Sequence, residues 1–145
     1  MVSRFVLTLL LVLASAASSA QDRKFIVAAP QAGLLFSNGV LVGDTLYISG
    51  TLGLDSQTGK PPSDADDEAR LVMDAIKKTV ESAGLTMADV VMLQIHCPDL
   101  SLYAAFNKVY RTYFQADLPA RAFIGSGKLL RDARFEVLGI AIKRK

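Results

Sequence analysis

The apolar side chains of residues 66–83 recur with the 3.6-residue period of an α-helix, which strongly constrains the local structure of this segment. One face of that helix collects Ala69, Val72, Met73, Ile76, Val80 and Ala83. The acidic residues 66–68 stand where the helix dipole favours negative charge, and Gly84 is a typical C-terminal stop. The pattern predicts one long amphipathic helix, whose apolar face has to pack on another element.

Strand patterns stand on both sides of this helix. The apolar runs that flank Gly43-Asp44 predict a β-hairpin, and a second amphipathic helix is expected over about residues 101–114. Further strands are expected at residues 90–97, 121–126 and 134–142. This order of elements predicts an α+β fold, a two-layer sandwich in which a mixed β-sheet carries two helices on one face.

The last predicted strand is apolar on both of its faces. Phe135 and Val137 alternate with Leu138 and Ile140, so the side of the sheet away from the helices is apolar as well. A sheet with one bare apolar face needs a cover, and the simplest cover is another copy of the same chain. The sequence therefore predicts a homo-oligomer.

The first twenty residues have the pattern of a secretory signal peptide. Arg4 precedes an apolar run over residues 5–13, and small residues follow up to Ala20. Cleavage after Ala20 would leave a single domain, residues 21–145, that is secreted or periplasmic and has no membrane segment. The alternative is an uncleaved anchor, but the apolar run 5–17 is shorter than the ~20 residues that cross a bilayer.

Composition argues against several classes of protein. The chain of 145 residues has 16 basic and 14 acidic side chains, which is a poor basis for binding nucleic acid. One Cys and one His cannot make an intramolecular disulfide or a zinc site, so no metal is expected. His96 and Cys97 are consecutive in a predicted strand and should point to opposite faces, which argues against a thiol nucleophile with a neighbouring base.

Two charged residues stand out in the apolar C-terminal region. Glu136 interrupts the last strand, where a buried carboxylate is costly unless it is paired or hydrogen-bonded. Arg121 begins the strand that the sequence order suggests is adjacent. One interpretation is a structural ion pair. The other is an arginine that binds an anionic substrate, beside a carboxylate that handles a water molecule.

Several separated sequence motifs occur in an order and spacing that are known from one protein family. The segment from Pro119 through Arg121 to Leu129, followed by Phe135-Glu136-Val137, resembles the signature of the Rid family of reactive intermediate deaminases, also called the YjgF family. The segments 29–39, 46–50 and 83–85 and the pair Asp99-Leu100 before Asn107 fit the same order. The resemblance covers residues 27–143.

This resemblance implies a chorismate-mutase-like fold that assembles as a homotrimer with clefts at the subunit interfaces. It also implies hydrolysis of 2-imino or enamine acids, such as 2-aminoacrylate, to 2-keto acids and ammonia without a cofactor. By resemblance to the corresponding residues of the family, Arg121 would hold the substrate carboxylate and Glu136 would position the water. Ser49 and Asn107 would be polar residues of the cleft.

The chain also departs from the family pattern at positions that would line the cleft. Phe36 replaces a frequent tyrosine and so lacks a hydroxyl, Phe123 replaces a smaller residue, and Thr51 replaces a frequent glutamine. These departures leave an alternative open, a non-catalytic exported trimer that binds small ligands or acts like a chaperone. Endoribonuclease activity, also found in the wider family, is disfavoured by the nearly balanced charge.

Overall fold

The computed structural model describes residues 22–28, 35–114 and 116–144, which form a single mixed sheet with two helices. The predicted signal peptide, residues 1–20, lies outside the described residues, and so does Pro30. The predicted α+β architecture is confirmed. No helix in the described ranges is both long enough and apolar enough to cross a lipid bilayer.

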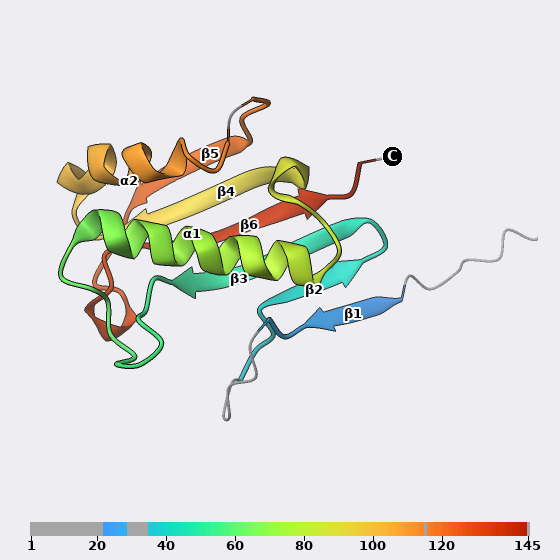
Figure 1. Cartoon of the computed structure of the whole chain (residues 1–145), viewed down its shortest axis with the longest axis horizontal. Helices are drawn as coiled ribbons and strands as arrows, with labels where there is room; N and C mark the ends of the chain where they lie inside the picture. The colour runs from blue at the N-terminus through green and yellow to red at the C-terminus, as the bar shows by residue number, and fades with distance from the viewer. Residues whose placement is uncertain (1–21, 29–34, 115, 145) are drawn as a thin grey trace, which may run out of the picture.

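The sheet has the strand order β1-β2-β3-β6-β4-β5 (Figure 1). Strands β4 and β5 are parallel, and every other neighbouring pair is antiparallel. The strands are β1 (Arg23–Ile26), β2 (Gly39–Val42), β3 (Thr45–Leu52), β4 (Val90–Cys97), β5 (Ala120–Gly125) and β6 (Glu136–Ile142). The helices are α1 (Ala65–Ser82) and α2 (Tyr103–Tyr110), with short 3₁₀ turns η1 (Met87–Asp89), η2 (Leu100–Leu102) and η3 (Leu130–Asp132).

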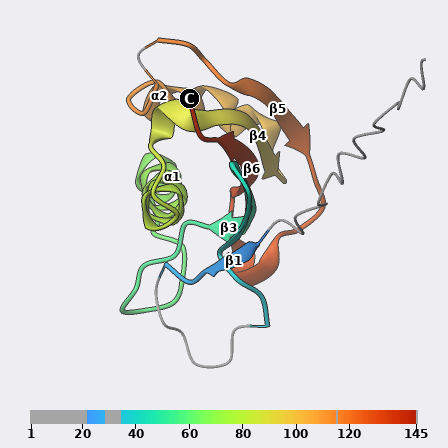
Figure 2. The same cartoon turned by 90° about the vertical axis from the view of Figure 1, so that its right-hand side faces the viewer.

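Both helices pack on the same face of the sheet, and the core lies between the two layers (Figure 2). From α1 the core receives Val72, Met73 and Ile76, all without exposed surface, and from β4 it receives Leu93 and Ile95. No helix or strand of the described residues covers the opposite face, which we call the open face (Figure 2).

Helix α1 begins and ends where its local sequence directs. The Asp64 carboxylate accepts a hydrogen bond from the Asp67 backbone N–H at 3.0 Å, which caps the N-terminus. At the C-terminus Gly84 adopts a φ of +82°, and the Leu85 N–H donates to the Val80 carbonyl at 3.1 Å. The helix predicted over residues 66–83 is thus confirmed within one residue at each end.

The structure differs from the sequence-based expectation in the second helix and in the last strand. Helix α2 has 8 residues instead of the expected 101–114. It begins late because the Asp99 side chain accepts from the Ser101 N–H and residues 100–102 form a 3₁₀ turn. It ends early because the N–H groups of residues 112 and 113 donate to the carbonyls three positions back. Strand β6 begins at Glu136 and not at 134, because the Arg134 and Phe135 N–H groups are used elsewhere.

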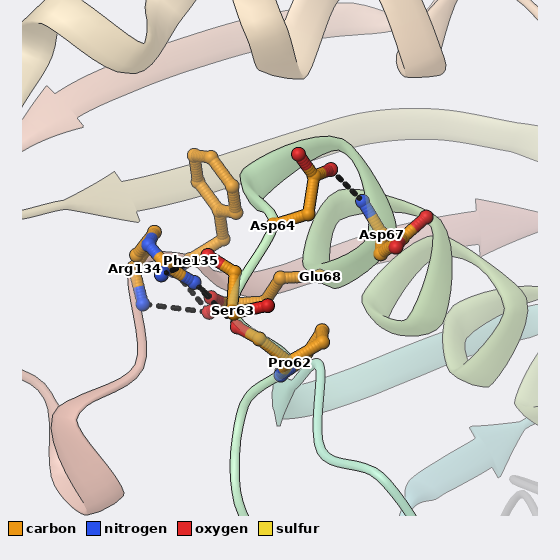
Figure 3. Close-up of polar contacts among 7 residues, drawn as sticks. All are labelled: Pro62, Ser63, Asp64, Asp67, Glu68, Arg134 and Phe135. Atoms are coloured by element: carbon orange, nitrogen blue, oxygen red, sulfur yellow. Dashed lines mark hydrogen bonds and ion pairs between the residues drawn. The ribbon is translucent and has the colours of Figure 1, made fainter.

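Those two N–H groups donate to a buried carboxylate. Glu68, on the first turn of α1, has no exposed surface, and its Oε1 accepts from the Arg134 N–H at 2.6 Å and from the Phe135 N–H at 3.1 Å. Its Oε2 accepts from Arg134 Nη1 at 2.6 Å (Figure 3). The same guanidinium donates to the carbonyls of Pro62 and Ser63, each at 2.8 Å. Glu68 and Arg134 therefore tie together the start of α1, the preceding loop and the start of β6.

Gly53, which directly follows β3, lies so close to α1 that a larger side chain at this position should destabilise the fold. A Cβ added to Gly53 would collide with the backbone carbonyl oxygen of Glu68. We therefore expect Gly53→Ala to lower the free energy of unfolding in urea by about 1–3 kcal/mol. Gly127 is the matched control, because nothing lies within 4 Å of its added Cβ and its φ is not positive. An equal loss in Gly127→Ala would contradict the explanation by close contact.

Candidate active site

Arg121 lies on the helix side of the sheet. It is opposite Leu93 in the parallel β4/β5 pair, and so it shares the face on which Leu93 is buried. Its Nη1 donates to Oδ1 of Asn107 at 2.6 Å, and its Nη2 donates to the hydroxyl of Tyr103 at 3.2 Å. Arg121 and Asn107, both selected from the sequence, are therefore in direct contact.

Aromatic rings surround the Arg121 guanidinium. Its Cζ lies 4.7 Å from the ring centroid of Tyr110 and 5.5 Å from that of Tyr103. The Phe123 ring meets Tyr103 edge-on at 5.1 Å and Phe106 at 5.6 Å. Three of the five guanidinium N–H donors make no hydrogen bond to any described residue, so they remain available to an anion.

The two tyrosines at this site were not among the residues selected from the sequence. Tyr103, Asn107 and Tyr110 follow one another at i, i+4 and i+7, which places them on one face of α2. That spacing was the signal that could have grouped both tyrosines with Asn107. Aromatic residues at helical spacing are more often core or interface residues, so the pattern alone did not single them out as site residues.

The hydroxyls of these tyrosines differ in their environments. Asn107 and the positive charge of Arg121 lower the pKa of Tyr103, which is 48% exposed. Burial raises the pKa of Tyr110, against the opposing effect of Arg121. The Tyr110 hydroxyl is buried and has no hydrogen-bond partner among the described residues.

Glu136 lies on the open face, opposite His96 in the β4/β6 pair. Its carboxylate packs over Gly50, where a Cβ would collide with Oε1, and it makes no hydrogen bond or ion pair with any described residue. The neighbouring Ser49 donates its hydroxyl to the carbonyl of Ser37 at 2.6 Å. Ser37 follows Phe36, whose side chain is 57% exposed.

The candidate residues thus form two groups. We call Tyr103, Asn107, Tyr110, Arg121 and Phe123 the arginine half-site, and Phe36, Ser49, Gly50 and Glu136 the glutamate half-site. Strand β4 separates β5 from β6, and Leu93 and His96, the β4 partners of Arg121 and Glu136, point to opposite faces. The expectation that Arg121 and Glu136 lie on adjacent strands is therefore wrong. Within one chain they form no ion pair.

Thr51, the remaining departure from the family pattern, bonds locally. Its hydroxyl donates to the Ser49 carbonyl at 2.9 Å, where the pairing of β3 with β6 shifts register between Ile48 and Thr51. The side chain therefore supports the bulge that carries Ser49 and Gly50. Its contact is with the backbone beside the glutamate half-site.

The Cys97 thiol is unsuited to nucleophilic chemistry in this fold. It is buried on the helix side with Sγ 3.1 Å from the Asp99 carbonyl oxygen, and burial raises the pKa of the thiol. His96 projects toward the open face, as the alternation of the strand predicted. Across residues 22–28, 35–114 and 116–144, no three His, Cys, Asp or Glu side chains gather in a way that could hold a metal ion.

Comparisons with known proteins agree with the fold and with the motifs. The family model described as Endoribonuclease L-PSP matches residues 26–143. The chain is 33% identical over 116 residues to the 2-iminobutanoate/2-iminopropanoate deaminase of Rattus norvegicus, covering 79% of this chain and 85% of that protein. It is 33% identical over 119 residues to the Escherichia coli protein of the same name, covering 80% and 93% respectively.

A solved structure shows the same architecture. The crystal structure of E. coli TdcF with bound serine superposes with a TM-score of 0.76 and 32% identity, covering 83% of this chain and 100% of that one. The family match over residues 26–143 includes strands β2 to β6 and both helices, and of β1 it includes only Ile26. The chain therefore belongs to the Endoribonuclease L-PSP family, also known as the YjgF/Rid family.

Proposed function

We propose that this protein hydrolyses reactive 2-imino acids and their enamine tautomers, such as 2-aminoacrylate, to 2-keto acids and ammonia. The observation that carries this proposal is the arginine half-site. A guanidinium fixed by Asn107 and Tyr103 still has three N–H donors that bond no described residue, enough for bidentate capture of a carboxylate. The names of the deaminases from rat and E. coli support the same chemistry.

In the proposed reaction Arg121 binds the substrate carboxylate and orients the imine carbon. Glu136 accepts a proton from a water molecule as that water attacks the carbon, which gives a tetrahedral amino alcohol. Glu136 then returns its proton to the amine nitrogen and the C–N bond breaks. The hydroxyl oxygen becomes the keto oxygen, and the proton that it loses passes to the departing ammonia. One water molecule is consumed and Glu136 regains its starting state. An iminium carbon is already electrophilic, so positioning and proton transfer are sufficient.

The positions of Arg121 and Glu136 support a site that is shared between copies of the chain. A glutamate on the open face cannot reach an arginine on the helix side of its own sheet, but the glutamate half-site of one copy can face the arginine half-site of the next. We propose a homotrimer in which each interface joins these two half-sites. The trimer would form three such clefts.

An apolar row across the open face supports this assembly. Strand register places Phe25, Val40, Tyr47, Ile140 and Met92 side by side on five successive strands. Phe25 and Tyr47 expose 64% and 52% of their surface, which is unfavourable in water and is relieved by contact with other copies.

A charge in the middle of that row should prevent assembly. We expect Ile140→Glu to sediment as a monomer in analytical ultracentrifugation, while the wild type sediments as a trimer, because a carboxylate in an apolar interface costs several kcal/mol. Lys78→Glu, on the exposed outer surface of α1, reverses a charge away from the open face and should leave the trimer intact. A trimeric Ile140→Glu protein would contradict the proposed interface.

Mixing two inactive variants tests the shared site. The assay follows the loss of a 2-imino acid that an amino-acid oxidase generates in situ. Arg121→Ala and Glu136→Gln should each be inactive alone. After the two chains are unfolded together and refolded, random trimers should regain about a quarter of the wild-type activity, because that fraction of interfaces joins an intact Arg121 to an intact Glu136. No recovery in mixed trimers would show that the two residues do not act across an interface.

A second function is ligand binding without turnover. The bound serine in TdcF favours it, because serine is a small molecule with a carboxylate that the arginine half-site of this chain could also bind. Calorimetric binding of a 2-keto acid together with an imine loss no faster than the uncatalysed rate would support this second function over the hydrolase.

A further inference from the structure

Tyr103 bonds Arg121 at the exposed end of the arginine half-site. Its hydroxyl lies 3.2 Å from Nη2, while Asn107 Oδ1 lies 2.6 Å from Nη1. Both acceptors come from α2, one turn apart. Two acceptors on the two terminal nitrogens fix the plane of the guanidinium, which a single hydrogen bond would leave free to rotate.

Tyr103 is itself held in place by the core. The Phe123 ring contacts it edge-on, with an interplanar angle of 88°, and Phe106, which is fully buried, packs against Phe123. Aromatic pairs in this geometry resist rotation. The ring of the half-exposed Tyr103 is therefore held by Phe123, which is partly buried and packs on the fully buried Phe106.

We propose that Tyr103 is a positioning residue, whose hydroxyl sets the orientation of the Arg121 guanidinium and so the angle at which a bound carboxylate is presented. This inference rests on the proposed function, in which Arg121 binds the substrate carboxylate. Tyr103 acts through Arg121 and takes no part in the proton transfers.

The charges around Tyr103 also predict how carboxylate binding should depend on pH. The positive groups that act on the phenol are Arg121 from β5 and Arg111 from the C-terminal end of α2, while Asn107 and Tyr110 on the same helix are uncharged near neutral pH. Asn107 and Arg121 lower the pKa of Tyr103. Above that pKa the phenolate is an internal anion for Arg121 and competes with the substrate carboxylate. Carboxylate binding should therefore weaken as the pH rises through the pKa of Tyr103.

The test is calorimetric titration of the full assembled protein with 2-oxobutanoate, the keto acid expected from a 2-iminobutanoate. It measures the affinity at pH 7 and the change of affinity with pH. Tyr103→Phe keeps the ring and its contacts with Phe123 but removes the hydroxyl. We expect its dissociation constant at pH 7 to rise about three- to tenfold, and its loss of affinity at alkaline pH to disappear. Urea unfolding of the same sample would show that the fold is retained, as expected for a half-exposed side chain.

Tyr113→Phe is the matched control. The Tyr113 hydroxyl lies 2.6 Å from Oδ1 of Asp74 on α1, so its loss removes a tyrosine hydroxyl of the same region that does not contact Arg121. This variant should bind 2-oxobutanoate as the wild type does, with the same alkaline loss.

Arg121→Ala separates this inference from the proposed function. If Arg121→Ala abolishes binding but Tyr103→Phe binds as the wild type does at every pH, the role of Tyr103 is overturned and the proposed function stands. If Arg121→Ala binds 2-oxobutanoate with wild-type affinity, the carboxylate site is contradicted and both proposals are overturned.

Discussion

Arg121→Ala is expected to remove nearly all acceleration of 2-imino acid loss, with a fall in kcat/KM of about 10²- to 10³-fold. Truncating one partner of a close charged pair typically costs about 2–5 kcal/mol, which corresponds to rate losses of this size. The fold should survive, because the partners of Arg121, Asn107 and Tyr103, are themselves partly exposed and can bond water instead. The measurement is the coupled oxidase assay with purified variant and wild type at equal concentration.

Two further arginine variants test whether a specific contact of Arg121, and not positive charge in general, explains the loss of activity. Arg121→Lys keeps the charge but loses the planar fork, so it should retain only a small part of the activity. Arg111→Ala removes a nearby exposed charge at the C-cap of α2 and should stay within about threefold of the wild type, as expected for a screened surface charge. If Arg111→Ala fell as far as Arg121→Ala, general positive potential and not a specific contact would explain the loss.

The parts of the fold that are coded locally were predictable from the sequence. The period of the apolar residues and the signals at Asp64 and Gly84 set the limits of α1, and the two-residue turn at Gly43-Asp44 set the hairpin of β2 and β3. Each of these depends on residues within a few positions of one another. Strand β4 matched its predicted range for the same reason, since Pro98 follows its last residue.

Local sequence signals of this kind did not predict the order of the strands in the sheet. Arg121 and Glu136 seemed adjacent because their strands follow one another along the chain, but β4 pairs with both and lies between them. The pairing depends on the parallel return of the chain through α2, which no local pattern specifies. Glu136 was therefore expected beside the wrong strand, although Arg121 and Glu136 could each be identified from the sequence.

Burial of a charge was equally hard to foresee. Glu68 stands in the first turn of an amphipathic helix, where an acidic residue is ordinarily explained by the helix dipole. Its burial depends on Arg134 and Phe135, which precede β6 and lie 66 and 67 residues away in sequence, and whose N–H groups donate to it. The sequence placed Glu68 on the correct helix but gave no sign of its partner Arg134.

Glu68→Gln is expected to lower the free energy of unfolding by about 3–5 kcal/mol, a large fraction of the stability of a small domain. The amide removes the charge that balances Arg134. It also brings an N–H₂ group toward donors that need acceptors, because two backbone N–H groups and one guanidinium nitrogen converge on this carboxylate. Urea unfolding followed by circular dichroism gives the midpoint and the slope from which the difference is calculated.

Two comparisons separate the buried carboxylate from an ordinary ion pair. Glu81 pairs with Lys77 on the exposed surface of α1 at 3.3 Å, so Glu81→Gln should cost only about 0.3–0.5 kcal/mol. Arg134→Met should cost less than Glu68→Gln, because Glu68 would still accept from the backbone N–H groups of residues 134 and 135. A larger loss in Arg134→Met would mean that the guanidinium contributes more than the carboxylate, as the counter-charge of the fully buried Glu68 and through its bonds to Pro62 and Ser63.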